Sequence, residues 1–165
     1  MKNLMLFLGL LMSSSLVFGQ GPKFEWAKAE GGQAQSITTD NAGNVIVVGY
    51  FSGTVDFDPS SSNTVNLTSN GADDVFIQKF TASGNLIWAK SIGSTSYDWA
   101  KGVATDVNRD IYITGYFNGT VDFNPGNGIY NLTSNGGSSN AFVLKIDGSG
   151  ESNFVWAKSY GVLGG

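Results

Sequence analysis

The chain contains no cysteine and no histidine among its 165 residues. Without cysteine no disulfide can form, so stability has to come from packing or from a metal. Without histidine, Ser-His-Asp catalysis, Cys-His catalysis and the usual zinc ligands are excluded. No unrepeated pair of acidic residues suggests an alternative catalytic pair. The sequence therefore predicts a protein that is not an enzyme and that holds no cofactor, apart from the calcium considered below.

Charge is also scarce, since only 13% of the residues are charged and acidic side chains outnumber basic ones by 13 to 9. An acidic protein of this kind is not expected to bind nucleic acid or an anionic membrane surface. Beyond the first 20 residues, no apolar run is long enough to cross a bilayer, so no membrane insertion is expected.

The N-terminus has the pattern of a secretory signal peptide over residues 1–19. Lys2 precedes a short apolar run, Leu4 to Met12, and small residues follow up to Gly19. This order predicts export with cleavage between Gly19 and Gln20, and thus a secreted or cell-surface protein. A buried N-terminal helix is the alternative interpretation.

The rest of the chain repeats itself. The segment GYFSGTVDFDP at 49–59 returns as GYFNGTVDFNP at 115–125, 66 residues later, and FEWAK, LIWAK and FVWAK end at Lys28, Lys90 and Lys158. Self-similarity at a fixed period indicates units that bury their apolar faces against their neighbours.

Each repeat contains four short segments rich in β-branched and aromatic residues, separated by Asp, Asn, Ser and Gly turns, and no segment shows a helical period. The predicted strands are 34–39, 44–51, 75–80 and 86–91 in the first repeat, and 101–105, 111–117, 141–146 and 154–158 in the second.

These features predict an all-β fold, a partial β-propeller of two four-stranded antiparallel blades plus an N-terminal outer strand. The expected organisation is an N-terminal strand of an incomplete blade at 20–33, blade 1 at 34–93, blade 2 at 94–161 and the start of a truncated next blade at 162–165. A β-sandwich and a β-solenoid are the alternatives. Two blades cannot close a ring, so either the chain is truncated or several copies assemble, and truncation is favoured.

The two repeats resemble the bacterial SBBP β-propeller repeat over nearly all of the predicted mature chain. The shared elements are a turn such as Asp40 to Asn44, a β-rich strand that reaches Gly-Tyr, and the Trp-Ala-Lys strand. The second repeat departs from this pattern at Val107 to Asp110, where the turn glycine is lost. The resemblance implies a secreted or surface-exposed, Bacteroidetes-like protein and supplies no catalytic residue.

Acidic loops are the first candidate sites. Asp56 and Asp58, with their counterparts Asp122 and Asn124, offer oxygen ligands that suit calcium. In the alternative interpretation, the aspartates cap turns while Phe57 and Phe123 fill gaps between blades.

Aromatic residues are the second candidates. Trp26, Trp88 and Trp156 recur at equivalent points, which favours packing between blades over stacking on sugars. Tyr97 and Trp99 have no counterpart in the first repeat and are assigned to a loop insertion before the second blade. We expect these two residues to contact a ligand.

The leading functional hypothesis is a non-catalytic binding, adhesion or scaffold module, whose partners are an unknown protein or glycan and further blades of a longer protein. The alternatives are a fragment of a propeller glycosidase or lyase and a structural spacer of a larger surface protein.

Overall fold

The computed structural model describes residues 32–135, 138–148, 150 and 152–161. The predicted signal peptide, most of the predicted strand at 20–33 and the segment 162–165 lie outside these residues. Every regular element of the described part is a strand. The all-β prediction is confirmed.

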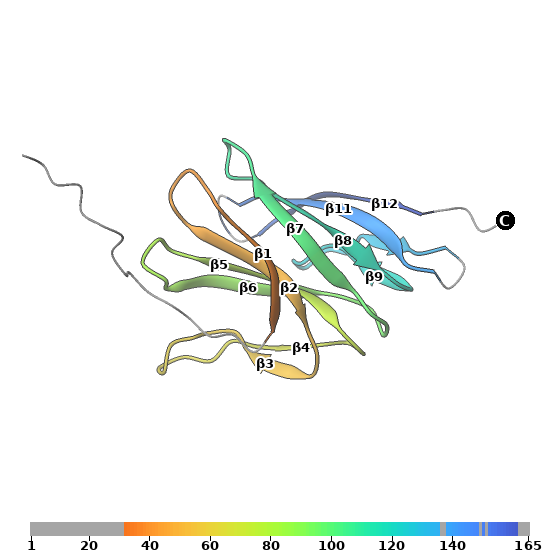
Figure 1. Cartoon of the computed structure of the whole chain (residues 1–165), viewed down its shortest axis with the longest axis horizontal. Coiled ribbons are helices and arrows are strands. Elements are labelled where there is room, and N and C mark those ends of the chain that lie inside the picture. Colours follow the sequence, from red (N-terminus) through yellow and green to blue (C-terminus); the bar gives the residue numbers. More distant parts are fainter. Residues whose placement is uncertain (1–31, 136–137, 149, 151, 162–165) are drawn as a thin grey trace, which may run out of the picture.

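Eight long strands form two four-stranded antiparallel sheets (Figure 1). The first sheet has the order β1-β2-β5-β6, with bounds β1 Gln33–Thr39, β2 Val45–Phe51, β5 Asp74–Phe80 and β6 Leu86–Ile92. The second has the same order, with bounds β7 Trp99–Thr105, β8 Ile111–Phe117, β11 Asn140–Ile146 and β12 Phe154–Tyr160. Each sheet is one blade, as predicted, and the fold is that of a partial propeller.

A small hairpin interrupts each blade between its second and third long strands. In the first repeat β3 (Thr54–Asp56) pairs with β4 (Asn66–Thr68), and in the second β9 (Thr120–Asp122) pairs with β10 (Asn131–Thr133). No strand is predicted in these segments, because a strand of three residues is too short to show a period.

The glycine of the repeated Gly-Tyr-Phe motif lies beside a β-bulge. The bulge falls between Ala34 and Ser36 in β1, and between Ala100 and Gly102 in β7. A Cβ atom on Gly49 or Gly115 would lie 2.0 Å from a backbone carbonyl oxygen of the bulged strand. The motif therefore needs glycine because the backbone passes too close for any side chain.

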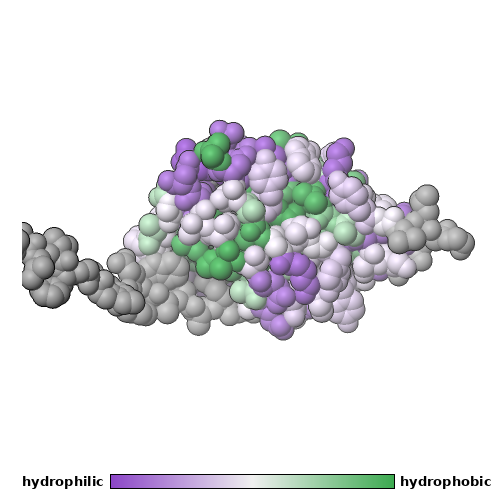
Figure 2. All heavy atoms as spheres, turned by 45° about the horizontal axis from the view of Figure 1, so that its top comes forward, coloured by the Kyte–Doolittle hydropathy of each residue, from purple (hydrophilic) through white to green (hydrophobic). Residues whose placement is uncertain are grey.

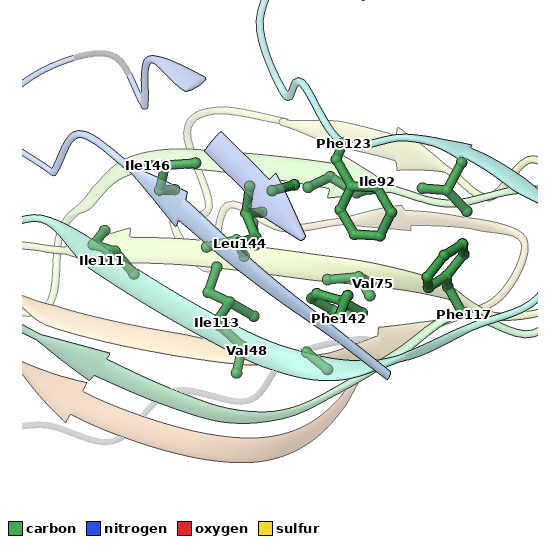
Figure 3. Close-up of a cluster of buried hydrophobic side chains, with 14 of the residues drawn as sticks. Val48, Val75, Ile92, Ile111, Ile113, Phe117, Phe123, Phe142, Leu144 and Ile146 are labelled. Atoms are coloured by element: carbon green, nitrogen blue, oxygen red, sulfur yellow. The ribbon is translucent and has the colours of Figure 1, made fainter. Parts of the chain in front are cut away.

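The interface between the two sheets joins unlike faces of the repeat (Figure 3). The first sheet contributes Ile46, Val48 and Ile77, whereas the second contributes Ile111, Ile113 and Leu144. The residues of the first repeat that are equivalent to Ile111 and Ile113, 66 positions earlier, are Val45 and Val47. Alternate residues of a strand point to opposite faces of its sheet. The second sheet therefore packs against the first through the face that is equivalent to the non-interface face of the first sheet. This head-to-tail stacking is typical of propeller blades, whereas a symmetric two-sheet sandwich would pair like faces.

A second apolar cluster lies on the far face of the first sheet. Its buried members are Phe51, Phe57, Phe76 and Ala89, and side chains of the β3–β4 hairpin pack against them. Phe57 and its counterpart Phe123 are both essentially inaccessible to solvent. The two phenylalanines thus hold each hairpin against its own sheet, and Phe123 also belongs to the interface between the sheets.

The two sheets approach closely at their first strands, β1 and β7, which lie side by side (Figure 1). The Thr105 hydroxyl donates to the Thr39 carbonyl at 2.9 Å, and the Val103 amide donates to the Ser36 hydroxyl at 3.2 Å. First strands that meet in this way are expected to form the inner wall of a propeller.

On the surface, Figure 2 shows apolar patches interspersed with polar side chains on the visible face. Among the described residues, no helix is long or apolar enough to cross a lipid bilayer.

Candidate functional site

Three aromatic rings from both sheets come together where β1, β2, β7 and β8 meet. We call Tyr50, Trp99 and Tyr116 the aromatic cluster. The Tyr50 and Trp99 rings stack with centroids 4.4 Å apart and planes at 11°, and the Trp99 and Tyr116 rings are 5.3 Å apart. All three side chains are half-buried. The cluster therefore joins the two sheets and still presents apolar surface to solvent.

The ammonium group of Lys101 lies against the aromatic cluster. Its Nζ is 4.4 Å from the centroid of Trp99, 5.5 Å from that of Tyr116 and 5.6 Å from that of Tyr50. The same Nζ donates to Gln35 Oε1 at 3.1 Å. Ring faces attract a cation at these distances, so the rings hold the lysine in place without neutralising its charge.

Polar groups fix the rings. The Trp99 indole N–H donates to Asp73 Oδ2 at 2.9 Å, and the Tyr50 hydroxyl donates to Gln33 Oε1 at 2.6 Å. Burial, together with the nearby Tyr50 and Asp73, raises the pKa of the Tyr116 phenol above its usual value. Tyr116 is consequently a neutral hydroxyl that can donate a hydrogen bond at any ordinary pH.

The structure corrects the sequence interpretation of Trp99. This residue is the first residue of β7, in the place that Gln33 occupies in β1, and not part of a loop insertion. The bulge after Ala100 shifts the register, so the start of the strand was placed two residues too late. Tyr97 does lie in the loop before β7, where it is 56% exposed.

Sequence reasoning missed Tyr50, Tyr116 and Lys101. Both tyrosines belong to the repeated Gly-Tyr-Phe motif, and a residue that recurs in both repeats gives no sign of a site in one of them. For Lys101, the sequence predicts only the start of the strand 101–105. One signal in the sequence could have revealed Lys101 as a candidate: Lys101 and Trp99 stand in the second repeat where the first has Gln35 and Gln33.

The acidic loops have turn-capping geometry. Asp56 Oδ1 accepts the amides of Asp58 and Val65 at 3.0 and 2.8 Å, and these bonds lower the pKa of its carboxyl group. Asp122 Oδ1 accepts the amides of Asn124 and Tyr130 in the same way, at 3.0 and 2.8 Å. One oxygen of each aspartate thus closes the loop of its hairpin.

The structure does not bring the four calcium candidates together, because Asp56 and Asp58 belong to one hairpin and Asp122 and Asn124 to the other. In the described part of the chain, no group of three or more His, Cys, Asp or Glu side chains is placed to hold a metal ion. Asp58 lines an open polar cavity of about 260 Å³ with Ser60, Asn63 and Asn85. Calcium binding here stays a prediction, which melting curves with and without the ion would test.

Two buried carboxyl groups lie next to the aromatic cluster. Asp98 accepts the amide and hydroxyl of Ser94 at 2.6 and 2.8 Å and the amide of Asn118 at 3.0 Å, so it links the connection between the sheets to the β8–β9 turn. Asp74 Oδ2 accepts the Asn70 amide at 3.0 Å, while its Oδ1 has no hydrogen-bond partner. Burial, with the nearby Asp98 charge, raises the pKa of Asp74 to about 6.

The recurring tryptophans behave as packing residues where they are described. The Trp88 indole N–H donates to the carbonyl of Gly150, in the turn between β11 and β12 of the other repeat, at 3.2 Å. Trp156 packs edge-on against Tyr112 of its own sheet, with centroids 6.3 Å apart. Trp26 lies outside the described residues.

Comparison with known proteins agrees with this architecture. Residues 76–123 match the family model of the SBBP beta-propeller repeat. An uncharacterized WD repeat-containing protein of Acanthamoeba polyphaga mimivirus is 32% identical over 98 residues, which are 52% of this chain and 7% of that protein. The fold and these matches define a β-propeller repeat protein. Within the matched segment, residues 76–123, the repeat is of the SBBP type.

Proposed function

We propose that this chain is a secreted or surface-exposed β-propeller segment that acts as a non-catalytic binding module, with the aromatic cluster and Tyr97 as its ligand contacts. The observation that supports this proposal is a break in the repetition. Trp99 and Lys101 stand where the first repeat has Gln33 and Gln35, while Tyr50 and Tyr116 are the same residue in both. A feature needed only for blade packing would recur in each repeat.

The physical properties of the cluster suit recognition. Half-exposed tyrosine and tryptophan side chains offer large contact areas with few rotamers to immobilise, and such residues dominate binding energies at interfaces. Hydrogen bonds from Trp99 to Asp73 and from Tyr50 to Gln33 hold two of the rings before any ligand arrives. Preorganised rings lower the entropic cost of binding.

Glycan-array binding with substituted variants tests this proposal. Trp99→Gln places the residue of the first repeat at the same position of the second, and we expect it to weaken binding at least tenfold. Tyr97→Ala should weaken binding by less. Trp156→Ala, on the outer strand, is the control and should bind as the unchanged protein does. Full binding by both Trp99→Gln and Tyr97→Ala would contradict the proposed site, and absence of any ligand would favour a structural spacer.

We further propose that the open face of the second sheet packs against another blade. Lys79 reaches from the first sheet to the carbonyl of Gly148 in the second while it pairs with Asp40. Its counterpart Lys145 pairs with Asp110 at 2.7 Å and keeps 18% of its side chain exposed. A next blade would supply the carbonyl that Gly148 supplies to Lys79.

Chemical labelling tests this contact. In a chain extended by a third copy of residues 94–161, Lys145 should react with an amine reagent several-fold more slowly than in the present chain. Lys158, exposed on the edge strand, should react at the same rate in both. An unchanged rate at Lys145 would argue against the blade contact.

Export is proposed from the N-terminal pattern alone. N-terminal sequencing of protein recovered outside the cell should begin at Gln20. Recovery of the chain only from the cytoplasm, with Met1 in place, would oppose it.

A further inference from the structure

We propose that the aromatic cluster and Lys101 bind a saccharide that bears a carboxylate, such as a uronic acid unit of an acidic polysaccharide. This inference rests on the proposed binding function and names the class of its ligand. It follows from the charge of Lys101, from the rings that hold it, and from the polar groups around them.

Within the part of the chain that the structure describes, Lys101 is a cation without an ionic partner. Its side chain is exposed, and among the described residues no carboxylate lies at ion-pair distance from its Nζ. Lys79 and Lys145, in contrast, each pair with an aspartate at 2.9 and 2.7 Å. The chain has a net charge of −4, which repels anions overall. An oriented ammonium group that no carboxylate neutralises attracts an anion locally.

The surroundings of Lys101 suit a sugar ring better than a small inorganic anion. The nitrogen lies within 5.6 Å of three ring centroids, so a carboxylate paired with it lies close to aromatic surface. A pyranose has an apolar C–H face that can lie on such rings. A bare anion would gain nothing from the rings and would lose hydration beside them.

Amide groups complete the site. Gln33 and Gln35 are exposed at the same edge of β1, where their side-chain oxygens already accept from Tyr50 and Lys101. An amide has both donor and acceptor atoms, which suits the hydroxyl groups of a sugar. The site therefore combines a flat apolar surface, one cation and neutral hydrogen-bonding groups.

Polygalacturonate and its methyl ester form a matched pair of probes, because esterification removes the charge and keeps the sugar backbone. Calorimetric titration of the intact chain should show binding to polygalacturonate that is at least tenfold tighter than to the ester, and that weakens as salt is added. Lys101→Gln, which copies Gln35, should abolish this preference, and Lys101→Arg should keep it. Lys158→Gln, at another exposed lysine, should change nothing.

Three outcomes would overturn the inference. Equal affinity for the two probes would show that charge is not recognised. Binding of both probes that Trp99→Gln removes and Lys101→Gln does not would leave the proposed binding function intact while refuting the role of Lys101. Binding of neither probe, with ligands found on the glycan array, would refute the acidic sugar and retain the function. Melting curves of each variant confirm that it is folded.

Discussion

Asp74 and Asn140 occupy the same position in the two repeats and accept the same backbone hydrogen bond, from Asn70 and Asn135 respectively. Each lies against a glycine, because a Cβ atom on Gly93 or Gly161 would lie within 2.5 Å of its side-chain atoms. Only Asp74 can ionise. Its burial therefore introduces a pH dependence that the second repeat lacks at this position.

Asp74→Asn is predicted to stabilise the protein at neutral pH. The pKa of Asp74 is raised to about 6 in the folded state, so the folded protein binds this proton more tightly than the unfolded chain does. The free energy of unfolding should thus fall as the pH rises from about 4 through 6, by on the order of 3 kcal/mol. Urea unfolding from pH 4 to pH 8 should show this loss in the unchanged protein and much less of it in the variant.

Asp58→Asn is the matched control, because Asp58 lies in a hairpin loop away from Asp98. It should leave the pH profile as it was. An identical profile for Asp74→Asn would show that Asp74 is not the group that titrates. Asp98, whose pKa burial also raises, would then be the next residue to replace.

Single residues also show where sequence reasoning reached its limit. Arg109 adopts the positive φ of 71° that Gly43 adopts in the first repeat at 78°, so the turn survives the loss of its glycine. Trp99 was placed wrongly because a bulge changes the register without any mark in the composition, and bulges follow from backbone contacts that the sequence does not display.

At the scale of strands, Lys79 and Lys145 occupy equivalent positions in the two repeats but have different surroundings. Lys79 on β5 is 2% exposed and lies between Asp40 and the Gly148 carbonyl. Although burial opposes ionisation, hydrogen bonds from Lys79 and Asn44 lower the pKa of Asp40 to about 2, so this carboxyl group is ionised throughout the usual pH range. Lys145 on β11 pairs with Asp106 and Asp110 and lies over the ring of Tyr112, all within its own repeat.

Lys79→Met should cost about 3–5 kcal/mol of unfolding free energy, because it leaves the carboxylate of Asp40 buried without its partner. Lys145→Met should cost about 1 kcal/mol or less, since that pair is still reached by water. Chemical denaturation at pH 7 measures both values. Equal costs would mean that contact with the second sheet adds nothing to the lysine of the first.

The long strands were predictable from sequence, and the small hairpins were not. Segments such as 111–117 and 154–158 differ from the observed strands by two residues or fewer, because their β-branched and aromatic residues lie between clear turn signals. The hairpins depend instead on Asp56 and Asp122, each of which closes a loop through two backbone amides. From the sequence, turn capping and calcium binding are both open for these aspartates, because both roles use the same carboxylate oxygens.

At the scale of the whole molecule, the two sheets share a single apolar core. Ile46, Val48 and Ile77 of the first sheet are fully buried in one cluster with side chains of the second. Figure 3 labels Val48 and Leu144 from the two sides of this cluster. Neither sheet can separate without exposing this surface to water, so we expect them to unfold together.

Leu144→Ala tests this cooperativity. The substitution should lower the free energy of unfolding by about 2–5 kcal/mol. In hydrogen exchange measured by mass spectrometry, β2 and β5 should lose protection in parallel with β8 and β11. Ile87→Ala, at a side chain that is 45% exposed on the outer strand, should have little effect. Loss of protection confined to the second sheet would show that the blades are independent.

The unlike faces that meet between the sheets give the array a polarity. However many units are joined in this manner, one end keeps a surface of the first kind and the other end keeps its complement. Only curvature that brings the two ends together can cover both at once. The number of units in a finished array is then a matter of the angle between neighbours, and a substitution that alters this angle could change the count without touching any contact within a unit.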